Sequence, residues 1–118
     1  VNSIEKSLPY WTEVLGYEKL ADVPHEGMIG FAILNKDGSE IMLQSHASLT
    51  ADLPPVAQIV RPGMMLLYSE VASIVEAQRS LDGVKPLVPL RTTFYGAKEV
   101  FVQDSDGNVL AFAEHAGA

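Results

Sequence analysis

Three histidines, His25, His46 and His115, are the side chains of this 118-residue chain best suited to bind a metal ion or transfer a proton. His25 lies in a Pro-His-Glu-Gly turn and is expected to be solvated, whereas His46 follows a predicted strand. Glu114 precedes His115, but neighbours on a strand point to opposite faces. No two histidines have the spacing of a metal-binding motif. The chain has no cysteine and no nucleophile-elbow motif, so the sequence assigns no catalytic residue.

A second group of residues that could contact a ligand lies at the predicted bend between two strands. It consists of Phe94, Tyr95 and Gly96. Exposed aromatic rings at such a bend can stack on a planar or cationic ligand. The alternative is that Phe94 packs in the core and only Tyr95 is exposed. Trp11 lies on the apolar stripe of a predicted helix, which favours core packing of its ring.

The charge balance limits the partners that this chain can bind. Fifteen acidic and eight basic residues give a formal net charge of −7. This charge disfavours nucleic acid and anionic membranes and favours cationic ligands, although an acidic surface that only maintains solubility is the alternative. No apolar run reaches the roughly 20 residues that span a bilayer. Because no secretion signal or cysteine is present, we expect a cytoplasmic protein.

A sequence pattern recurs in the two halves of the chain. Val-Asn-Ser-Ile at residues 1–4 resembles Val-Ala-Ser-Ile at residues 71–74, an offset of 70. Asp37-Gly38 matches Asp106-Gly107 at an offset of 69. The nearly constant offset indicates two copies of one structural unit.

A helix is predicted at the start of each half. The helix of the second half begins at Ser73 and Glu76, which have the spacing of a capping box. The helix of the first half has Asn2 or Ser3 as its cap. Pro9 falls inside its apolar stripe, so a kink or a later helix start is expected.

Alternating apolar residues and turn residues predict seven strands. They cover residues 17–23, 28–34, 40–44, 64–71, 84–90, 97–103 and 108–114. Asp-Gly between two such runs is a strong hairpin signal. Prolines interrupt the segment between the halves, so the single domain divides into module one (1–50), a connector (51–62) and module two (63–118).

The repeat also predicts a strand before the first residue. The second half reads strand, helix and three strands, whereas the first half starts at its helix. The counterpart of strand 64–71 would lie almost wholly before Val1. We therefore expect that about six or seven residues of a first strand are missing from this sequence.

Two segments are the parts of the chain most typical of a known family. They are Ser-Ile-Glu-Lys-Ser-Leu-Pro-Tyr-Trp-Thr-Glu-Val-Leu-Gly-Tyr at residues 3–17 and Phe-Tyr-Gly-Ala-Lys-Glu-Val-Phe-Val-Gln-Asp-Ser-Asp-Gly-Asn-Val-Leu-Ala-Phe-Ala-Glu at residues 94–114. They resemble the vicinal-oxygen-chelate superfamily of glyoxalases, bleomycin-resistance proteins and extradiol dioxygenases. The resemblance implies an α+β fold of two βαβββ modules. These form a cup-shaped mixed sheet with the helices on its outer face and a ligand in the cup.

The resemblance also indicates where relatives that use a divalent metal would hold it. Three of those positions correspond to Met42, Leu66 and Ala111, and the fourth would precede Val1. None of these three side chains is a ligand that a hard divalent cation prefers. The prediction is therefore that these positions hold no metal and that the chain has no cofactor.

Strand alternation extends this comparison to a set of residues expected to line the cup. Residues of the same parity as the three matched positions are Glu40, Gln44, His46, Tyr68, Glu70, Val109 and Ala113. Gln44 and Tyr68 could orient a ligand by hydrogen bonds above an apolar floor, although Gln44 at a solvent-facing strand end is the alternative. The predicted ligand-binding residues are Met42, Gln44, Leu66, Tyr68, Phe94, Tyr95 and Ala111.

Two functions follow from the resemblance, and whether the chain is an enzyme stays open. The first is metal-free binding of a small organic molecule, cationic or aromatic, as in bleomycin-resistance proteins. The alternative is a divalent-metal-dependent lyase or isomerase, dioxygenase or fosfomycin-type transferase. Its metal would be held by Gln44, His46 or Glu114 and a group before Val1. The resemblance further implies a homodimer, in which paired units complete the cups.

Overall fold

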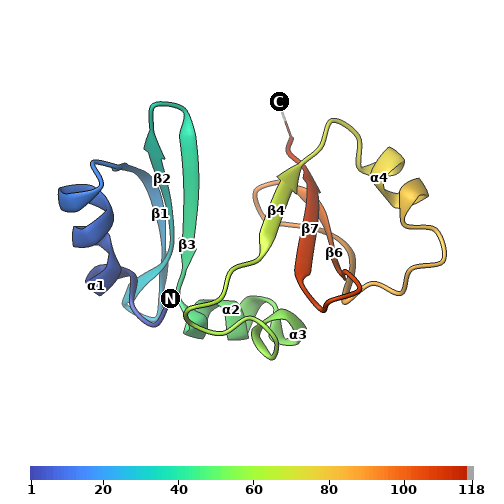
Figure 1. The fold of residues 1–118 in the computed structure, drawn as a ribbon, viewed down its shortest axis with the longest axis horizontal. Helices are drawn as coiled ribbons and strands as arrows, with labels where there is room; N and C mark the ends of the chain where they lie inside the picture. The colour runs from blue at the N-terminus through green and yellow to red at the C-terminus, as the bar shows by residue number, and fades with distance from the viewer. Residues whose placement is uncertain (117–118) are drawn as a thin grey trace. The chain divides into compact units, whose positions relative to one another are not determined.

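The computed structural model describes residues 1–116 and divides the chain into two compact units. The first unit is Val1–Gly63, and the second begins at Met64. Each unit carries a helix against a β-sheet, as Figure 1 shows for each half of the chain. The predicted α+β class is thereby confirmed. No helix within residues 1–116 is long and apolar enough to cross a lipid bilayer.

The sheet of the first unit is an antiparallel meander. Its strands, in their order across the sheet, are β1 (Glu18–His25), β2 (Met28–Lys36) and β3 (Ser39–Gln44). The predicted turn joins β2 to β3, and both of its residues have positive φ, 51° at Asp37 and 83° at Gly38. These are the dihedrals of a type I′ hairpin, whose twist matches that of the paired strands.

The first helix starts as α1 (Ile4–Pro9) and continues as a π-helix, η1 (Tyr10–Val14). Ser3 is the cap, since its hydroxyl accepts a hydrogen bond from the amide three residues later at 3.2 Å. Pro9 has no amide hydrogen to donate to the preceding turn, and the helix changes register directly after it. The expected late start is therefore wrong, because the helix begins before Pro9 and widens after it.

The core of the first unit lies between α1 and the sheet. Its buried side chains are Ile4, Ala32, Leu34 and Leu43, against which Leu8, Trp11, Tyr17 and Ile41 pack. The Trp11 ring meets Tyr17 edge to face, with ring centroids 5.2 Å apart, which confirms the predicted core position of Trp11. Because Leu43 points to α1, its neighbours Met42 and Gln44 lie on the opposite face of β3.

Two short helices follow β3, namely α2 (His46–Asp52) and α3 (Pro54–Ala57). The Ser45 hydroxyl caps α2, and Pro54 begins α3 at a position where proline leaves no amide unpaired. His46 is the first residue of α2, and its Nε2 lies 3.0 Å from the carbonyl oxygen of Ala57. The expectation that His46 extends the ligand-facing side of β3 is wrong, because the chain turns into α2 at Ser45.

The second unit contains a mixed four-stranded sheet. Its elements are β4 (Leu67–Glu70), α4 (Ile74–Ser80), β5 (Val88–Thr92), β6 (Lys98–Gln103) and β7 (Val109–Glu114). The order across the sheet is β4, β7, β6, β5, and β4 runs parallel to β7. This is the predicted βαβββ unit. Leu66, however, precedes β4, because the strand predicted for residues 64–71 is confined to Leu67–Glu70.

Two side chains fix the start of α4. The Ser73 hydroxyl accepts a hydrogen bond from the Glu76 amide at 3.2 Å, which is half of the predicted capping box. The Glu76 carboxylate instead binds Arg79, at 2.7 Å. Glu114 of β7 supplies the other interaction, since its Oε1 accepts a hydrogen bond from the Ile74 amide at 3.0 Å. Glu114 therefore faces the helix, as its strand parity predicts.

The repeat seen in the sequence is also present in the hydrogen bonds. The Val1 amino group donates to the Gln44 carbonyl at 3.0 Å, and the Val71 amide donates to the Ala113 carbonyl at 2.8 Å. The pair Phe31 and Gln44 in the first sheet thus corresponds to Glu99 and Ala113 in the second. In the described part of the chain, β3 has no strand partner besides β2, whereas β7 lies between β4 and β6. The expected additional first strand stays a prediction.

Candidate functional site

The sheet of the second unit has one face packed against α4 and an opposite face, the inner face. Glu114 marks the helix side of β7, so Ala111 and Ala113 belong to the inner face. The strand register adds the residues beside them, and the inner face then comprises Tyr68, Glu70, Arg91, Glu99, Phe101, Ala111 and Ala113. Four of these residues carry polar or charged groups, and the other three, Phe101, Ala111 and Ala113, are apolar.

A buried ion pair lies on the inner face between β5 and β6. The Glu99 residue is only 2% exposed. Arg91 stands opposite it, with Nη2 at 2.6 Å and Nε at 2.9 Å from the same oxygen, Oε1. A buried carboxylate is stable only when its charge is paired and its oxygens accept hydrogen bonds. Arg91 meets this need at one of the two oxygens of Glu99.

Tyr68 links this ion pair to His115. Its hydroxyl donates to Oε2 of Glu99 at 3.3 Å and lies 2.9 Å from Nε2 of His115. Burial of the phenol and, secondarily, the negative charge of Glu99 raise the pKa of Tyr68 well above its usual value. The phenol therefore stays neutral and keeps its proton for hydrogen bonding at physiological pH.

Aromatic rings extend this arrangement toward the β5–β6 turn. The His115 ring meets Tyr68 edge to face at 5.9 Å between centroids, and it lies 6.4 Å from Tyr95. Tyr95 in turn meets Phe94 edge to face at 5.0 Å. Phe94 is 88% exposed and Tyr95 is 55% exposed. The alternative in which Phe94 packs in the core is therefore wrong, because the turn directs its ring outward.

Together these residues form the polar–aromatic cluster, defined as Tyr68, Arg91, Phe94, Tyr95, Glu99 and His115. The turn that presents its aromatic end is tightly bonded. The Thr93 amide donates to the Ala97 carbonyl at 2.8 Å, and the Thr93 hydroxyl accepts from the Ala97 amide at 3.0 Å. Gly96 completes the turn with a φ of 87°, which a side chain would strain.

Comparison with known proteins identifies the family. The model of the Glyoxalase/Bleomycin resistance protein/Dioxygenase superfamily matches residues 1–112. The chain belongs to this superfamily. A comparison with curated proteins gives no match.

Solved structures of the superfamily type share the fold. A superfamily member from Vibrio splendidus 12B01 is 21% identical over 97% of this chain and 91% of that chain, with a TM-score of 0.68. A hypothetical protein from Bacillus halodurans C-125 is 23% identical over 100% and 90%, with a TM-score of 0.70. Methylmalonyl-CoA epimerase from Mycobacterium tuberculosis is 19% identical over 98% and 83%, with a TM-score of 0.75. At these identities the likeness establishes the fold alone.

The residues predicted to bind a ligand in this superfamily member occupy different places. Tyr68, Phe94 and Tyr95 are brought together in the polar–aromatic cluster, and Ala111 is fully buried on the same inner face. Leu66 lies in the loop before β4.

Met42 and Gln44 belong to the first unit. They lie there on the face of β3 turned away from α1, where Met42 is 37% exposed. Gln44 is partly buried and donates through Nε2 to the Ser48 hydroxyl at 3.1 Å. The Gln44 side chain therefore contacts α2. It is not fully exposed to solvent, as the alternative interpretation of Gln44 would require.

Sequence reasoning missed two members of the cluster, Arg91 and Glu99, and it considered His115 without assigning it to the site. Glu99 stands between Lys98 and a run of apolar residues in β6, where a carboxylate needs a partner. A charged residue beside this apolar run was visible in the sequence. Its face of the sheet and its pairing with Arg91, however, required the strand register.

The three positions that the sequence resemblance matched to metal ligands carry no suitable donor in this chain. Met42, Leu66 and Ala111 offer a thioether and two aliphatic groups. Across residues 1–116, no three His, Cys, Asp or Glu side chains converge on a common point. Both oxygens of Glu99, the buried carboxylate of the cluster, already accept hydrogen bonds from Arg91 and Tyr68. The described residues therefore do not fit a divalent ion.

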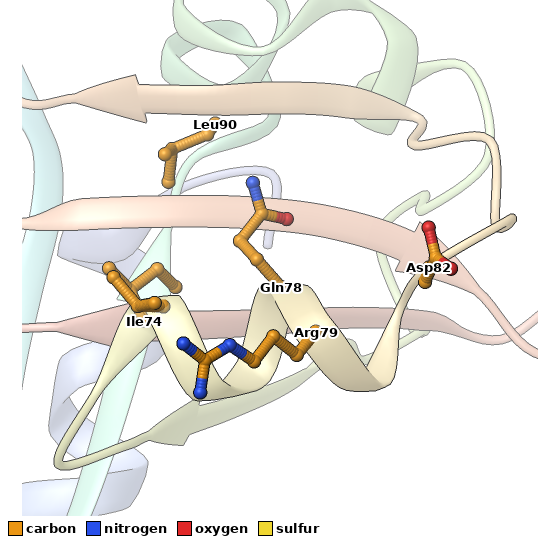
Figure 2. Close-up of a pocket in the computed structure, with 6 residues that line it drawn as sticks. Ile74, Gln78, Arg79, Asp82 and Leu90 are labelled. Carbon is orange, nitrogen blue, oxygen red and sulfur yellow. The ribbon is translucent and has the colours of Figure 1, made fainter.

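An open groove of about 460 Å³ lies on the opposite side of the second sheet, between α4 and β5. Figure 2 shows Ile74, Gln78 and Arg79 on α4, Asp82 in the turn after it, and Leu90 on β5. None of these residues belongs to the polar–aromatic cluster. Leu90 has the opposite parity to Arg91, so the groove and the cluster lie on different faces of the sheet.

Proposed function

We propose that this chain binds a small planar organic cation, without a metal ion, at the polar–aromatic cluster. The observation that carries the proposal is the continuous row of rings Tyr68, His115, Tyr95 and Phe94 beside the buried Glu99. Aromatic faces carry negative electrostatic potential and attract planar cations by stacking. An exposed ring such as Phe94 has a face available for that contact.

The charges around the cluster support a cationic ligand. Arg91 pairs with Glu99, so this ion pair contributes little net charge to the site. Glu70 lies on the same face, two residues from Tyr68, and its side chain is exposed. The formal net charge of −7 further raises the local concentration of cations. A cation is therefore favoured over an anion of the same shape.

The remaining parts of the proposal concern the wider context. Ala111 lies on the same face as the cluster, and Leu66, directly before β4, is proposed as an additional ligand contact. Met42 and Gln44 lie in the first unit, and their role as ligand contacts stays a prediction. We also propose a cytoplasmic homodimer. Sedimentation of the purified protein tests the proposed homodimer, because a monomer at micromolar concentration contradicts that oligomeric state.

Fluorescence titration with planar cations tests the proposed function. We expect saturable one-to-one binding that weakens about 5- to 30-fold when Tyr95 or Phe94 is replaced by alanine, since one stacked ring contributes about 1–2 kcal/mol. Tyr10→Ala is the matched control, because Tyr10 is a comparably exposed aromatic residue, at 60%, on η1 of the first unit. Absence of binding, or stoichiometric divalent metal in the purified protein, overturns the proposal.

A further inference from the structure

The hydrogen bonds around Tyr68 determine which nitrogen of His115 carries a proton. The Tyr68 hydroxyl has a single proton and contacts both Oε2 of Glu99, at 3.3 Å, and Nε2 of His115, at 2.9 Å. The carboxylate, paired with Arg91, can only accept. If Tyr68 donated to His115, its oxygen lone pair would face Oε2 without a proton between them. Tyr68 therefore donates to Glu99 and accepts from His115, whose Nε2 carries a hydrogen.

This arrangement leaves the second ring nitrogen of His115 as an acceptor. In a neutral imidazole only one nitrogen is protonated, so Nδ1 keeps its lone pair. No hydrogen bond to Nδ1 is found among residues 1–116, and the ring is only partly buried beside Tyr95. The hydrogen-bonded chain of Arg91, Glu99, Tyr68 and His115 thus fixes Nδ1 as an acceptor, much as an outer partner fixes the tautomer of a metal-binding histidine.

We infer that the ligand of the cluster carries an N–H donor that binds Nδ1 of His115. This inference rests on the proposed function and narrows its ligand class to protonated or amino-substituted nitrogen heterocycles. A quaternary cation of the same shape can stack on Tyr95 and Phe94 but leaves Nδ1 unpaired. Because an unpaired polar group is costly when a ligand covers it, the site discriminates between these two classes.

Two matched probes test the inference: aminoacridine, a planar cation with N–H donors, and N-methylacridinium, a planar cation with none. We expect wild-type protein to bind aminoacridine about 10- to 100-fold more tightly, the range expected for a hydrogen bond to a charged group. In His115→Phe the ratio of the affinities for aminoacridine and N-methylacridinium should fall to about one, because an aromatic ring remains but the acceptor nitrogen is lost. His25→Phe is the control, and its ratio should match wild type.

Nitrogen-15 NMR of the histidine rings gives a readout that does not depend on a ligand. We expect His115 to be the Nε2–H tautomer in wild type and to lose this preference in Tyr68→Phe. An Nδ1–H tautomer in wild type, or equal affinity for the two acridines, overturns this inference and leaves the proposed function intact. If neither acridine binds, the proposed function is overturned together with it.

Discussion

Arg91 and Glu99 face each other across β5 and β6, and two nitrogens of the guanidinium contact one oxygen of the carboxylate at 2.6 and 2.9 Å. The Glu99 side chain is almost fully buried, whereas that of Arg91 is 28% exposed. The two partners therefore differ in what their removal leaves behind. Replacement of Arg91 alone leaves the buried carboxylate of Glu99 without its cationic partner. Replacement of Arg91 and Glu99 together removes both charges.

Arg91→Met is expected to lower the free energy of unfolding by about 3 kcal/mol, since it leaves Glu99 unpaired in a buried position. The double variant Arg91→Met/Glu99→Met should recover most of this loss, because no buried charge remains. Urea denaturation of the single and double variants measures both values. A double variant as unstable as Arg91→Met alone contradicts this explanation.

Tyr68 should ionise at a higher pH than free tyrosine, because burial and the charge of Glu99 raise its pKa. The unfolded chain then loses this proton at lower pH than the folded chain does, so stability falls as the pH rises above about 10. Below that pH the phenol is protonated in the folded and the unfolded state, so it does not contribute to the pH dependence of the free energy of unfolding. Ultraviolet titration and urea denaturation of wild type and Tyr68→Phe test this prediction. A loss of stability at alkaline pH that is steeper in the variant than in wild type would refute it.

Phe94→Ser should weaken binding of the aminoacridine probe about 10-fold, by removing an exposed stacking surface. Because Phe94 is 88% exposed, its replacement should change the free energy of unfolding by less than about 0.5 kcal/mol. Parallel titration and thermal unfolding separate the two effects. A large loss of stability would show that Phe94 supports the fold instead of the site.

Ala111→Glu places a carboxylate at one of the positions that the sequence resemblance matched to a metal ligand. Ala111 is fully buried between Tyr68 and Phe101, so we expect destabilisation of at least about 3 kcal/mol from the buried charge and the added volume. Excess Zn²⁺ or Mn²⁺ should not restore stability. A rise in melting temperature on metal addition, absent in wild type, contradicts the conclusion that this position does not suit a metal.

Glu114→Ala should lower the free energy of unfolding by about 1 kcal/mol, because the Ile74 amide at the start of α4 loses its acceptor. Glu76→Ala is the control on the same helix. Its carboxylate forms only an exposed pair with Arg79, and its removal should cost less than about 0.5 kcal/mol. Equal effects in urea denaturation would mean that Glu114 does not stabilise the helix start.

Local patterns predicted most of the strands of this fold. The Asp-Gly turns, strand alternation and the repeat place β2, β3, β6 and β7 within a few residues of their observed bounds, because each signal depends on neighbouring residues. The π-helix after Pro9 and the helices α2 and α3 were not predicted. Their conformations depend on packing and on hydrogen bonds that no simple periodicity records.

The candidate site was predicted less completely than the fold. Tyr68, Phe94 and Tyr95 were chosen for their ring chemistry and their places on strands and turns, and the structure brings them together. Arg91 and Glu99 were missed because their contact requires the register of the β5–β6 hairpin. His115 joins them through Tyr68, 47 positions away in sequence. Such contacts are set by tertiary structure, not by spacing along the chain.

Phe31 occupies in the first sheet the register position that Glu99 occupies in the second. Equivalent points of the two sheets therefore carry chemically opposite residues, an aromatic ring in one and a buried carboxylate in the other. The first sheet needs no arginine at this register position, whereas the second must keep Arg91 beside Glu99 to neutralise the buried charge.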